Sequence, residues 1–133
     1  MTRGFNGKEF YTGSDYRRKF TFTRQSDDDV NYTDATVFVD FYDTISSTSP
    51  MLSLSSATSA IDITTNEQAT QVFTLTLTAA NLTTLLNSQT NQNIVGYVFK
   101  IQPDGGNPQG QERGKGWDGV IRVMPPAYSA QER

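Results

Sequence analysis

Residues 71–101 read QVFTLTLTAANLTTLLNSQTNQNIVGYVFKI, and the hydrophobic period changes twice within this stretch. The first part alternates between apolar and polar side chains, and its larger apolar residues in step are Phe73, Leu75 and Leu77. The last part alternates again, with Val95, Tyr97, Phe99 and Ile101 in step. Alternation of aromatic and β-branched residues is typical of a strand with one buried face. The pattern therefore predicts a strand at each end of this stretch.

The middle part of the stretch changes to helical spacing. Leu82, Leu85 and Leu86 lie three and four residues apart, which places them on one face of a short helix. Thr78 is placed to cap this helix, because its hydroxyl can accept a hydrogen bond from a free N–H group of the first turn. Such a short helix is unstable alone in water. We therefore expect its leucines to pack over the open end of a sheet core.

The composition favours a small all-β domain, and its net charge does not favour binding to nucleic acid. The chain has 133 residues, enough for one domain with a real core, and its hydrophobic fraction of 35% includes eight Phe. A net charge of −3 gives no basic field for nucleic acid. No apolar run approaches the roughly 18 residues that span a bilayer, and the N-terminus has no apolar signal-peptide core, so we expect no membrane insertion.

Further strands are predicted on both sides of the central stretch. Residues 16–23, 35–42, 51–55, 61–64 and 116–124 each have a short apolar or alternating pattern, and turn-forming residues separate them. Together with the central pair they predict an immunoglobulin-like antiparallel β-sandwich of about seven strands with one short helix. The Gly-rich residues 102–116 contain Asp-Gly-Gly, which is a strong signal for a chain reversal.

The chain divides into an N-terminal extended arm (1–15), the β-sandwich domain (16–124) and a C-terminal tail (125–133). The arm has three glycines and no sustained period, yet it carries Phe5, Phe10 and Tyr11. Aromatic residues are scarce in disordered segments. Two interpretations remain open: the arm docks on a neighbouring subunit, or it folds back on its own domain.

Catalytic chemistry has few candidates in this sequence. It contains no His and no Cys, which removes the commonest general base, the commonest transition-metal ligand and thiolate chemistry. Lys8, Lys19 and Lys115 lie in segments that predict exposure, so none is a candidate for a depressed pKa. Asp40 and Asp43 are three apart on a strand and face opposite sides. We expect no enzymatic activity, no cofactor and no small-molecule substrate.

Three weaker patterns each have a plain structural explanation. Residues 17–19 are Arg-Arg-Lys, which would suit a phosphate but also a solvated or guarded strand edge. Residues 27–29 are three aspartates, but they lack the spacing of a calcium loop, so a solvated turn is favoured and no metal site is expected. Trp117 with Tyr97 or Tyr128 would stack on a sugar, although a single Trp at a strand start is more often a filler of core or edge.

The order of these motifs resembles the immunoglobulin-like domain of tailed-phage virion proteins, such as the N-terminal domain of phage upper baseplate proteins. The motifs that carry the resemblance are Thr33-Asp34-Ala35-Thr36-Val37, the strand and leucine helix of residues 75–86, and the strand of residues 96–101 with its Asp-Gly turn. The resemblance covers about residues 16–124. Residues 102–116 are longer than the turns that often join strands in that family.

The resemblance implies a non-enzymatic structural protein of a bacteriophage virion, in the baseplate, the tail or attached to the head as a capsid decoration. Its partners would be other phage structural proteins and copies of itself, and its location the virion. The candidate partner-binding residues are Phe5, Phe10, Tyr11, Trp117 and Tyr128. The alternative hypothesis is a stand-alone carbohydrate-binding β-sandwich module for host-surface glycans, which would present Trp117 or a tyrosine on an open face.

Overall fold

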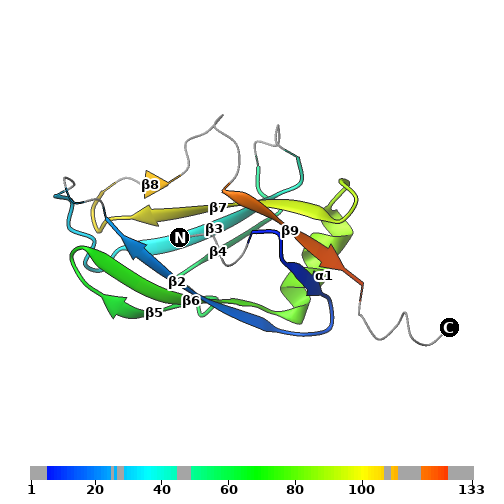
Figure 1. The fold of residues 1–133 in the computed structure, drawn as a ribbon, viewed down its shortest axis with the longest axis horizontal. Helices are drawn as coiled ribbons and strands as arrows, with labels where there is room; N and C mark the ends of the chain where they lie inside the picture. The colour runs from blue at the N-terminus through cyan, green and yellow to red at the C-terminus, as the bar shows by residue number, and fades with distance from the viewer. Residues whose placement is uncertain are drawn as a thin grey trace.

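The computed structural model describes residues 6–24, 26, 29–44, 49–106, 109–110 and 118–125, and these form two packed β-sheets (Figure 1). Among them are nine strands and one helix: β1 (Glu9–Tyr11), β2 (Tyr16–Thr23), β3 (Thr36–Tyr42), β4 (Leu52–Ser55), β5 (Ile61–Asn66), β6 (Thr70–Leu77), α1 (Ala79–Ser88), β7 (Ile94–Gln102), β8 (Gln109–Gly110) and β9 (Gly119–Met124). The prediction of an all-β sandwich with one short helix is confirmed.

The larger sheet has the strand order β1-β9-β7-β3-β4, with β8 pairing on β7, and the smaller sheet has the order β2-β6-β5. The described pairs are antiparallel except β1 with β9, which is parallel. In immunoglobulin-type sandwiches, strands B, E and D share one sheet while C, F and G share the other. Taking β2 as strand B and β3 as strand C reproduces this division, and β4 then occupies the C′ position.

The core lies between the two sheets and is built from one face of each strand. On β6 the buried residues alternate as predicted, with Phe73, Leu75 and Leu77 at most 1% exposed. On β7 the residues Val95, Tyr97, Phe99 and Ile101 are likewise buried. The ring centroids of Phe20 and Phe99 lie 4.8 Å apart across the two sheets, and those of Phe73 and Phe99 lie 6.1 Å apart. These aromatic contacts join the sheets at the centre of the sandwich.

Helix α1 follows β6 directly and begins where the sequence predicts. Thr78 is its N-cap: the Thr78 hydroxyl accepts from the N–H of Asn81 at 3.1 Å, and the Asn81 side chain accepts from the N–H of Thr78 at 3.0 Å. Leu82 and Leu85 are fully buried, and the helix contacts β9 and β4 of the larger sheet. The predicted leucine packing at the sheet end is confirmed.

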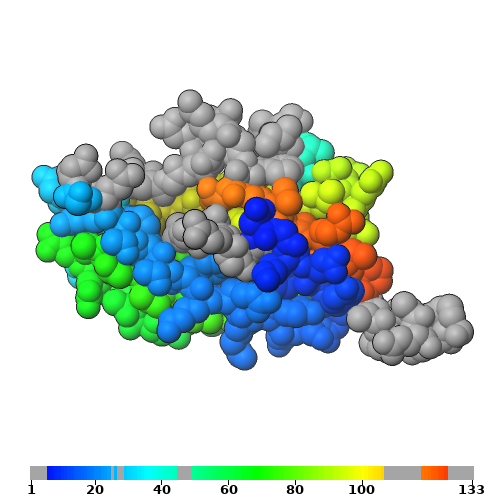
Figure 2. Space-filling view, in the orientation of Figure 1, coloured from blue at the N-terminus to red at the C-terminus, as the bar shows by residue number. Residues whose placement is uncertain are grey.

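The prediction of an extended arm over residues 1–15 is wrong for residues 9–11. They form β1, and Figure 2 shows this segment in dark blue against β9 in orange. Phe10 is fully buried and lies opposite Val123. Gly13 between β1 and β2 has φ +96°, which favours glycine, so the chain reverses there and enters the second sheet. Of the two open interpretations, folding back holds for the described part of the arm.

Gly119 makes a close approach of the N-terminal segment possible. A side-chain carbon at position 119 would lie 2.6 Å from both Asn6 Oδ1 and the Tyr97 hydroxyl. Without it, Asn6 Oδ1 accepts from the N–H of Val120 at 3.0 Å, and Gly7 N–H donates to the Val120 carbonyl at 2.7 Å. Among the described residues, contacts with the sandwich therefore begin at residue 6, and not at residue 16.

The remaining boundaries differ from the prediction by a few residues. The strands expected at 35–42, 51–55 and 61–64 are β3, β4 and β5. The strand expected at 116–124 is β9, and residues 116–117 of the expected range lie outside the described part. The Asp-Gly-Gly reversal is confirmed: Gly106 N–H donates to the Pro103 carbonyl at 2.9 Å, and Gly105 has φ +76°. Strands β1 and β8 account for the two additional elements. Of the predicted tail, only Pro125 is described.

Candidate functional site

The outer face of the larger sheet is the candidate functional surface, because it combines charge with apolar area. On β3, Val37, Val39 and Phe41 point into the core, so the side chains of Phe38, Asp40 and Tyr42 project from the opposite face. On β7 the same alternation places Val98 and Lys100 on that face. In the β3–β7 register Asp40 lies opposite Val98, and Lys100 lies opposite Phe38.

An ion pair lies at the centre of this outer face. Lys100 Nζ lies 3.0 Å from Asp40 Oδ2, and the side chains are 28% and 12% exposed respectively. The two residues are diagonal neighbours on adjacent strands, which brings long side chains within reach. Val98, directly opposite Asp40, is 6% exposed, and Phe38, directly opposite Lys100, is half-buried. The pair joins β3 to β7 on this face.

Apolar side chains extend this surface toward β9. One cross-strand row contains Tyr42 on β3, Gly96 on β7 and Val120 on β9. Gly96 has no side chain, so the middle of the row is recessed between the half-buried side chains of Tyr42 and Val120. This row suits a flat apolar contact better than a deep ligand site.

The predicted partner-binding residues are distributed differently from the expectation. Phe10 is fully buried in its own domain, with its ring centroid 4.9 Å from that of Tyr16 and the Arg18 guanidinium 5.4 Å from its ring centroid. It is therefore a core residue, and its assignment to partner binding is wrong. Phe5, Trp117 and Tyr128 lie outside the described residues.

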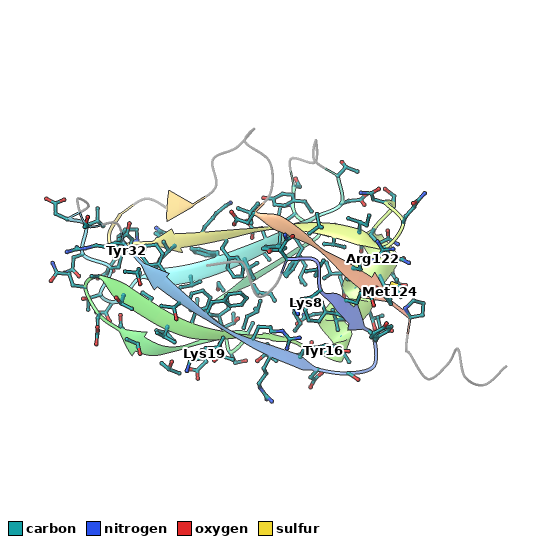
Figure 3. All side chains as sticks on the ribbon, viewed as in Figure 1. Lys8, Tyr16, Lys19, Tyr32, Arg122 and Met124 are labelled. Atoms are coloured by element: carbon teal, nitrogen blue, oxygen red, sulfur yellow. The ribbon has the colours of Figure 1, made fainter. Side chains whose placement is uncertain are left out.

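Tyr11 is half-buried, and its polar groups are used within the domain. The Tyr11 hydroxyl donates to Glu9 Oε1 at 3.0 Å, and its backbone N–H donates to the Tyr16 hydroxyl at 3.2 Å (Figure 3 labels Tyr16). The hydrogen bond to the Glu9 carboxylate and the charge of that carboxylate raise the pKa of Tyr11 above its ordinary value. The hydrogen bond from the Tyr11 N–H joins the end of β1 to the start of β2.

Several aspartates bind backbone or side-chain groups on other elements. Asp118 Oδ2 accepts from the N–H of Phe99 at 2.6 Å, and burial raises the pKa of Asp118 although that hydrogen bond opposes the shift. Asp43 accepts from the N–H of Thr90 at 2.7 Å and from its hydroxyl, and these hydrogen bonds lower the pKa of Asp43. Each carboxylate thus joins two segments that are distant in the sequence.

A second polar cluster lies at the opposite end of the sandwich, near the label of Tyr32 in Figure 3. Gln71 is fully buried, and its Nε2 donates to the Tyr32 carbonyl at 2.8 Å and to Asn66 Oδ1 at 3.0 Å. Asn66 in turn donates to Asp34 Oδ1 at 2.8 Å. Gln71 Oε1 has no partner among the described residues. This cluster joins the loop before β3 to the turn between β5 and β6.

The other candidate residues that the structure describes do not come together in a site. Within the part of the chain that the structure describes, no group of three His, Cys, Asp or Glu residues could hold a metal ion. Asp27, Asp28 and Lys115 lie outside that part. Lys8, Arg17 and Lys19 are exposed. Among the described residues, no helix has both the length and the apolar character needed to cross a membrane.

Sequence reasoning missed two contacts, one on this outer face and one at the start of α1. Lys100 was not considered as a partner of Asp40, because the residues are 60 positions apart and only the strand register makes them neighbours. Asp15 was also missed: it accepts from the N–H of Ala79 at 2.7 Å and adds a second acceptor at the start of α1. Alternation alone could have placed Asp40 and Lys100 on outer faces, but it could not have shown that they are diagonal neighbours on adjacent strands.

A comparison of the chain with models of known protein families gives no match, and a comparison with curated proteins gives none either.

Proposed function

We propose that this protein is a non-enzymatic structural component of a tailed-bacteriophage virion, in the baseplate, the tail or on the head. It would assemble with other phage structural proteins and with copies of itself. The order of sequence motifs that resembles phage immunoglobulin-like domains supports this proposal. The division of strands between the sheets, with β2, β6 and β5 in one and β3, β7 and β9 in the other, is compatible with that resemblance.

The observation that carries the proposal is that four aspartates bind groups within the domain. Asp15, Asp40, Asp43 and Asp118 each bind a group on a distant segment, at 2.7, 3.0, 2.7 and 2.6 Å. A catalytic carboxylate has to reach a reacting group, whereas these four hold a loop, a strand or a helix end. Their placement favours a rigid building block that presents surfaces to neighbours.

The outer face around Asp40 and Lys100 is the surface that we assign to contacts with other subunits. Aromatic residues such as Phe38 and Tyr42 bury large areas at interfaces and retain a polar handle in the case of Tyr. A half-buried ion pair beside them would add orientation more than affinity. This combination suits a neighbour that docks in one register.

The proposal is tested by purifying phage particles from a bacterial culture that produces the protein. Quantitative mass spectrometry should find the chain in the particles at a fixed ratio to the major structural proteins, and a high-salt wash should leave it there. A tagged Tyr42→Ala variant, supplied in the same culture, should enter the particles less well than tagged wild-type protein. A tagged Thr83→Ala variant on the exposed side of α1 is the control.

Two results would contradict the proposal. Finding the chain only in the soluble fraction, with none in washed particles, would remove the virion role. Binding of the purified protein to a panel of bacterial surface glycans, lost with Tyr42→Ala, would favour the carbohydrate-binding alternative instead.

A further inference from the structure

Five strands have an open side in the described part of the chain: β1, β4 and β8 in the larger sheet, and β2 and β5 in the smaller. Open edges invite pairing with another chain, and proteins guard them with charges, bulges or short length. β2 carries Arg17, Arg18 and Lys19. β5 has a register shift between Ile63 and Thr65, and β1 has three residues. β8 has only two residues, so four of the five edges are protected by charge, a register shift or very short length.

β4, with four residues, is longer than β1 and β8, and it has neither a charge nor a register shift. Its register with β3 runs without a shift from Phe38 opposite Ser55 to Phe41 opposite Leu52. No Asp, Glu, Lys or Arg occurs between Asp43 and Asp62, so the strand and its flanks carry no charge. An edge that has neither a charge nor a register shift is unexpected for a surface that remains in water.

The backbone of β4 shows which groups face the open edge. Ser56 N–H donates to the Val37 carbonyl at 2.8 Å, so residue 56 bonds toward β3. Because antiparallel partners bond through alternate residues, residues 52 and 54 also bond toward β3, while Ser53 and Ser55 direct their N–H and C=O groups outward. The Ser55 carbonyl accepts from the Thr58 hydroxyl at 3.1 Å. Ser53, which is exposed, thus presents both a donor and an acceptor at the edge.

We propose that the β4 edge pairs with the β4 edge of a second copy of this chain, antiparallel and centred on Ser53. At this centre the two Ser53 residues would exchange two backbone hydrogen bonds. Each Ser55 would then lie opposite Met51 of the other copy. The neighbouring groups are already satisfied, since Met51 N–H donates to the Phe41 carbonyl at 2.7 Å and the Ser55 carbonyl binds Thr58.

Charge and symmetry favour a second copy as the occupant. A two-fold contact brings each residue of the strand close to the same segment of its partner. Self-pairing of β2 would oppose Arg17, Arg18 and Lys19 with the same three cations, and like charges across a pair are destabilising. Self-pairing of β4 opposes Ser53 with Ser53, Leu52 with Leu54 and Met51 with Ser55, and none of these side chains is charged. The pairing would extend the larger sheet across two subunits, and it does not depend on the proposed virion role.

A cysteine substitution tests the pairing directly, because the natural chain has no Cys. Opposed residues of a hydrogen-bonded antiparallel pair have Cα atoms about 5.5 Å apart, which is within the range for a disulfide. The Ser53→Cys variant of the full chain should therefore form a disulfide-linked dimer under mild oxidation, reversed by a reducing agent. Thr21→Cys is the matched control. Thr21 is also exposed, and its backbone faces the open edge of β2 because Arg24 N–H bonds to the Ala69 carbonyl.

A proline substitution tests the backbone bonds without a new covalent link. Ser53→Pro removes the outward N–H but leaves the bonds to β3, which use alternate residues. Analytical ultracentrifugation over a range of concentrations should show a reversible dimer for the wild type. Because each copy loses one bond, Ser53→Pro should weaken that dimer about tenfold or more. Thr21→Pro should leave it unchanged.

Each experimental outcome tests a different part of the proposal. A monomer at all concentrations, or equal cross-linking of the Thr21→Cys and Ser53→Cys variants, would overturn the pairing. A dimer that persists in Ser53→Pro would show that another surface is used. A dimer in solution together with absence from phage particles would leave the pairing intact and remove only the virion role.

Discussion

Phe10 lies directly opposite Val123 in the parallel pair of β1 and β9, and both side chains are fully buried. The contact joins residues near the two ends of the described chain. It places the N-terminal segment inside the sandwich, where Arg122 N–H also donates to the Lys8 carbonyl at 2.9 Å (Figure 3 labels both residues). Removing residues 1–12 would therefore remove a strand and a core aromatic, and the domain would lose stability.

Phe10→Ala is expected to lower the free energy of unfolding by about 3–5 kcal/mol, since it empties a fully buried aromatic position. Urea denaturation followed by tryptophan fluorescence and circular dichroism measures the change. Lys8→Ala, two residues earlier and exposed, should change stability by less than about 0.5 kcal/mol. An equal midpoint for Phe10→Ala and wild type would mean that β1 is detached in solution.

The sequence could not predict β1, for a physical reason. Three residues are too few to establish a period of two, and the segment acquires its structure from β9, more than one hundred residues away. The strand–helix–strand unit of residues 71–101 was predictable because its signals are local. Alternation on β6 and β7, the 82/85/86 spacing and the Thr78 cap each depend on residues within a few positions.

Leu85→Asp is expected to destabilise the domain by several kcal/mol, because it places an unpaired carboxylate at a fully buried position of α1. Thr84→Asp is the matched control, since Thr84 is the exposed neighbour on the same helix. Thermal unfolding followed by circular dichroism compares the two variants with wild type. Similar melting temperatures for the two aspartate variants would show that the leucine face of α1 is not packed on the sheet.

The candidate surface was harder to predict than the fold. Asp40 and Lys100 become neighbours only through the β3–β7 register, and a shift of one residue would place them on opposite faces. Alternation gives the face of each strand but not the residue opposite. The acceptors Asp15 and Asp43 were likewise hidden, because their donors at Ala79 and Thr90 are far away in the sequence.

Removal of one partner of the Asp40–Lys100 pair should cost more than removal of both. Lys100→Met leaves a carboxylate that is 12% exposed without its cation, and we expect a loss of about 1–3 kcal/mol in unfolding free energy. The double variant Asp40→Val, Lys100→Met should recover part of this loss, because both new side chains match the apolar neighbours Phe38 and Val98. A double-mutant cycle from urea unfolding measures the coupling. Additive losses would mean that the pair contributes nothing to stability.

Asp43→Asn is expected to flatten the acid side of the stability profile. Hydrogen bonds from the Thr90 hydroxyl and N–H lower the pKa of Asp43 below its ordinary value of 3.8. The stabilisation from the ionised group is therefore fully present above pH 3.8, and it is lost as the pH falls through the lowered folded-state pKa. The stability difference between wild type and variant should be constant near neutrality and shrink in acid. A difference that grows on acidification would contradict this assignment.

Asp118→Asn should give the opposite trend. Burial raises the pKa of Asp118 above its ordinary value of 3.8, so the folded protein holds the proton more tightly than the unfolded chain does. The favourable contribution of the protonated group is complete below pH 3.8 and is lost as the pH rises through the raised folded-state pKa. An asparagine stays neutral at every pH and keeps an oxygen that can accept from the N–H of Phe99, which lies 2.6 Å from Asp118 Oδ2. The variant should therefore gain stability relative to wild type at neutral pH and lose that gain in acid.

Urea unfolding of wild type, Asp43→Asn and Asp118→Asn over the same pH series measures both trends. A loss of stability at neutral pH in Asp118→Asn would mean that the ionised carboxylate is the better acceptor, and that its hydrogen bond outweighs the burial of its charge.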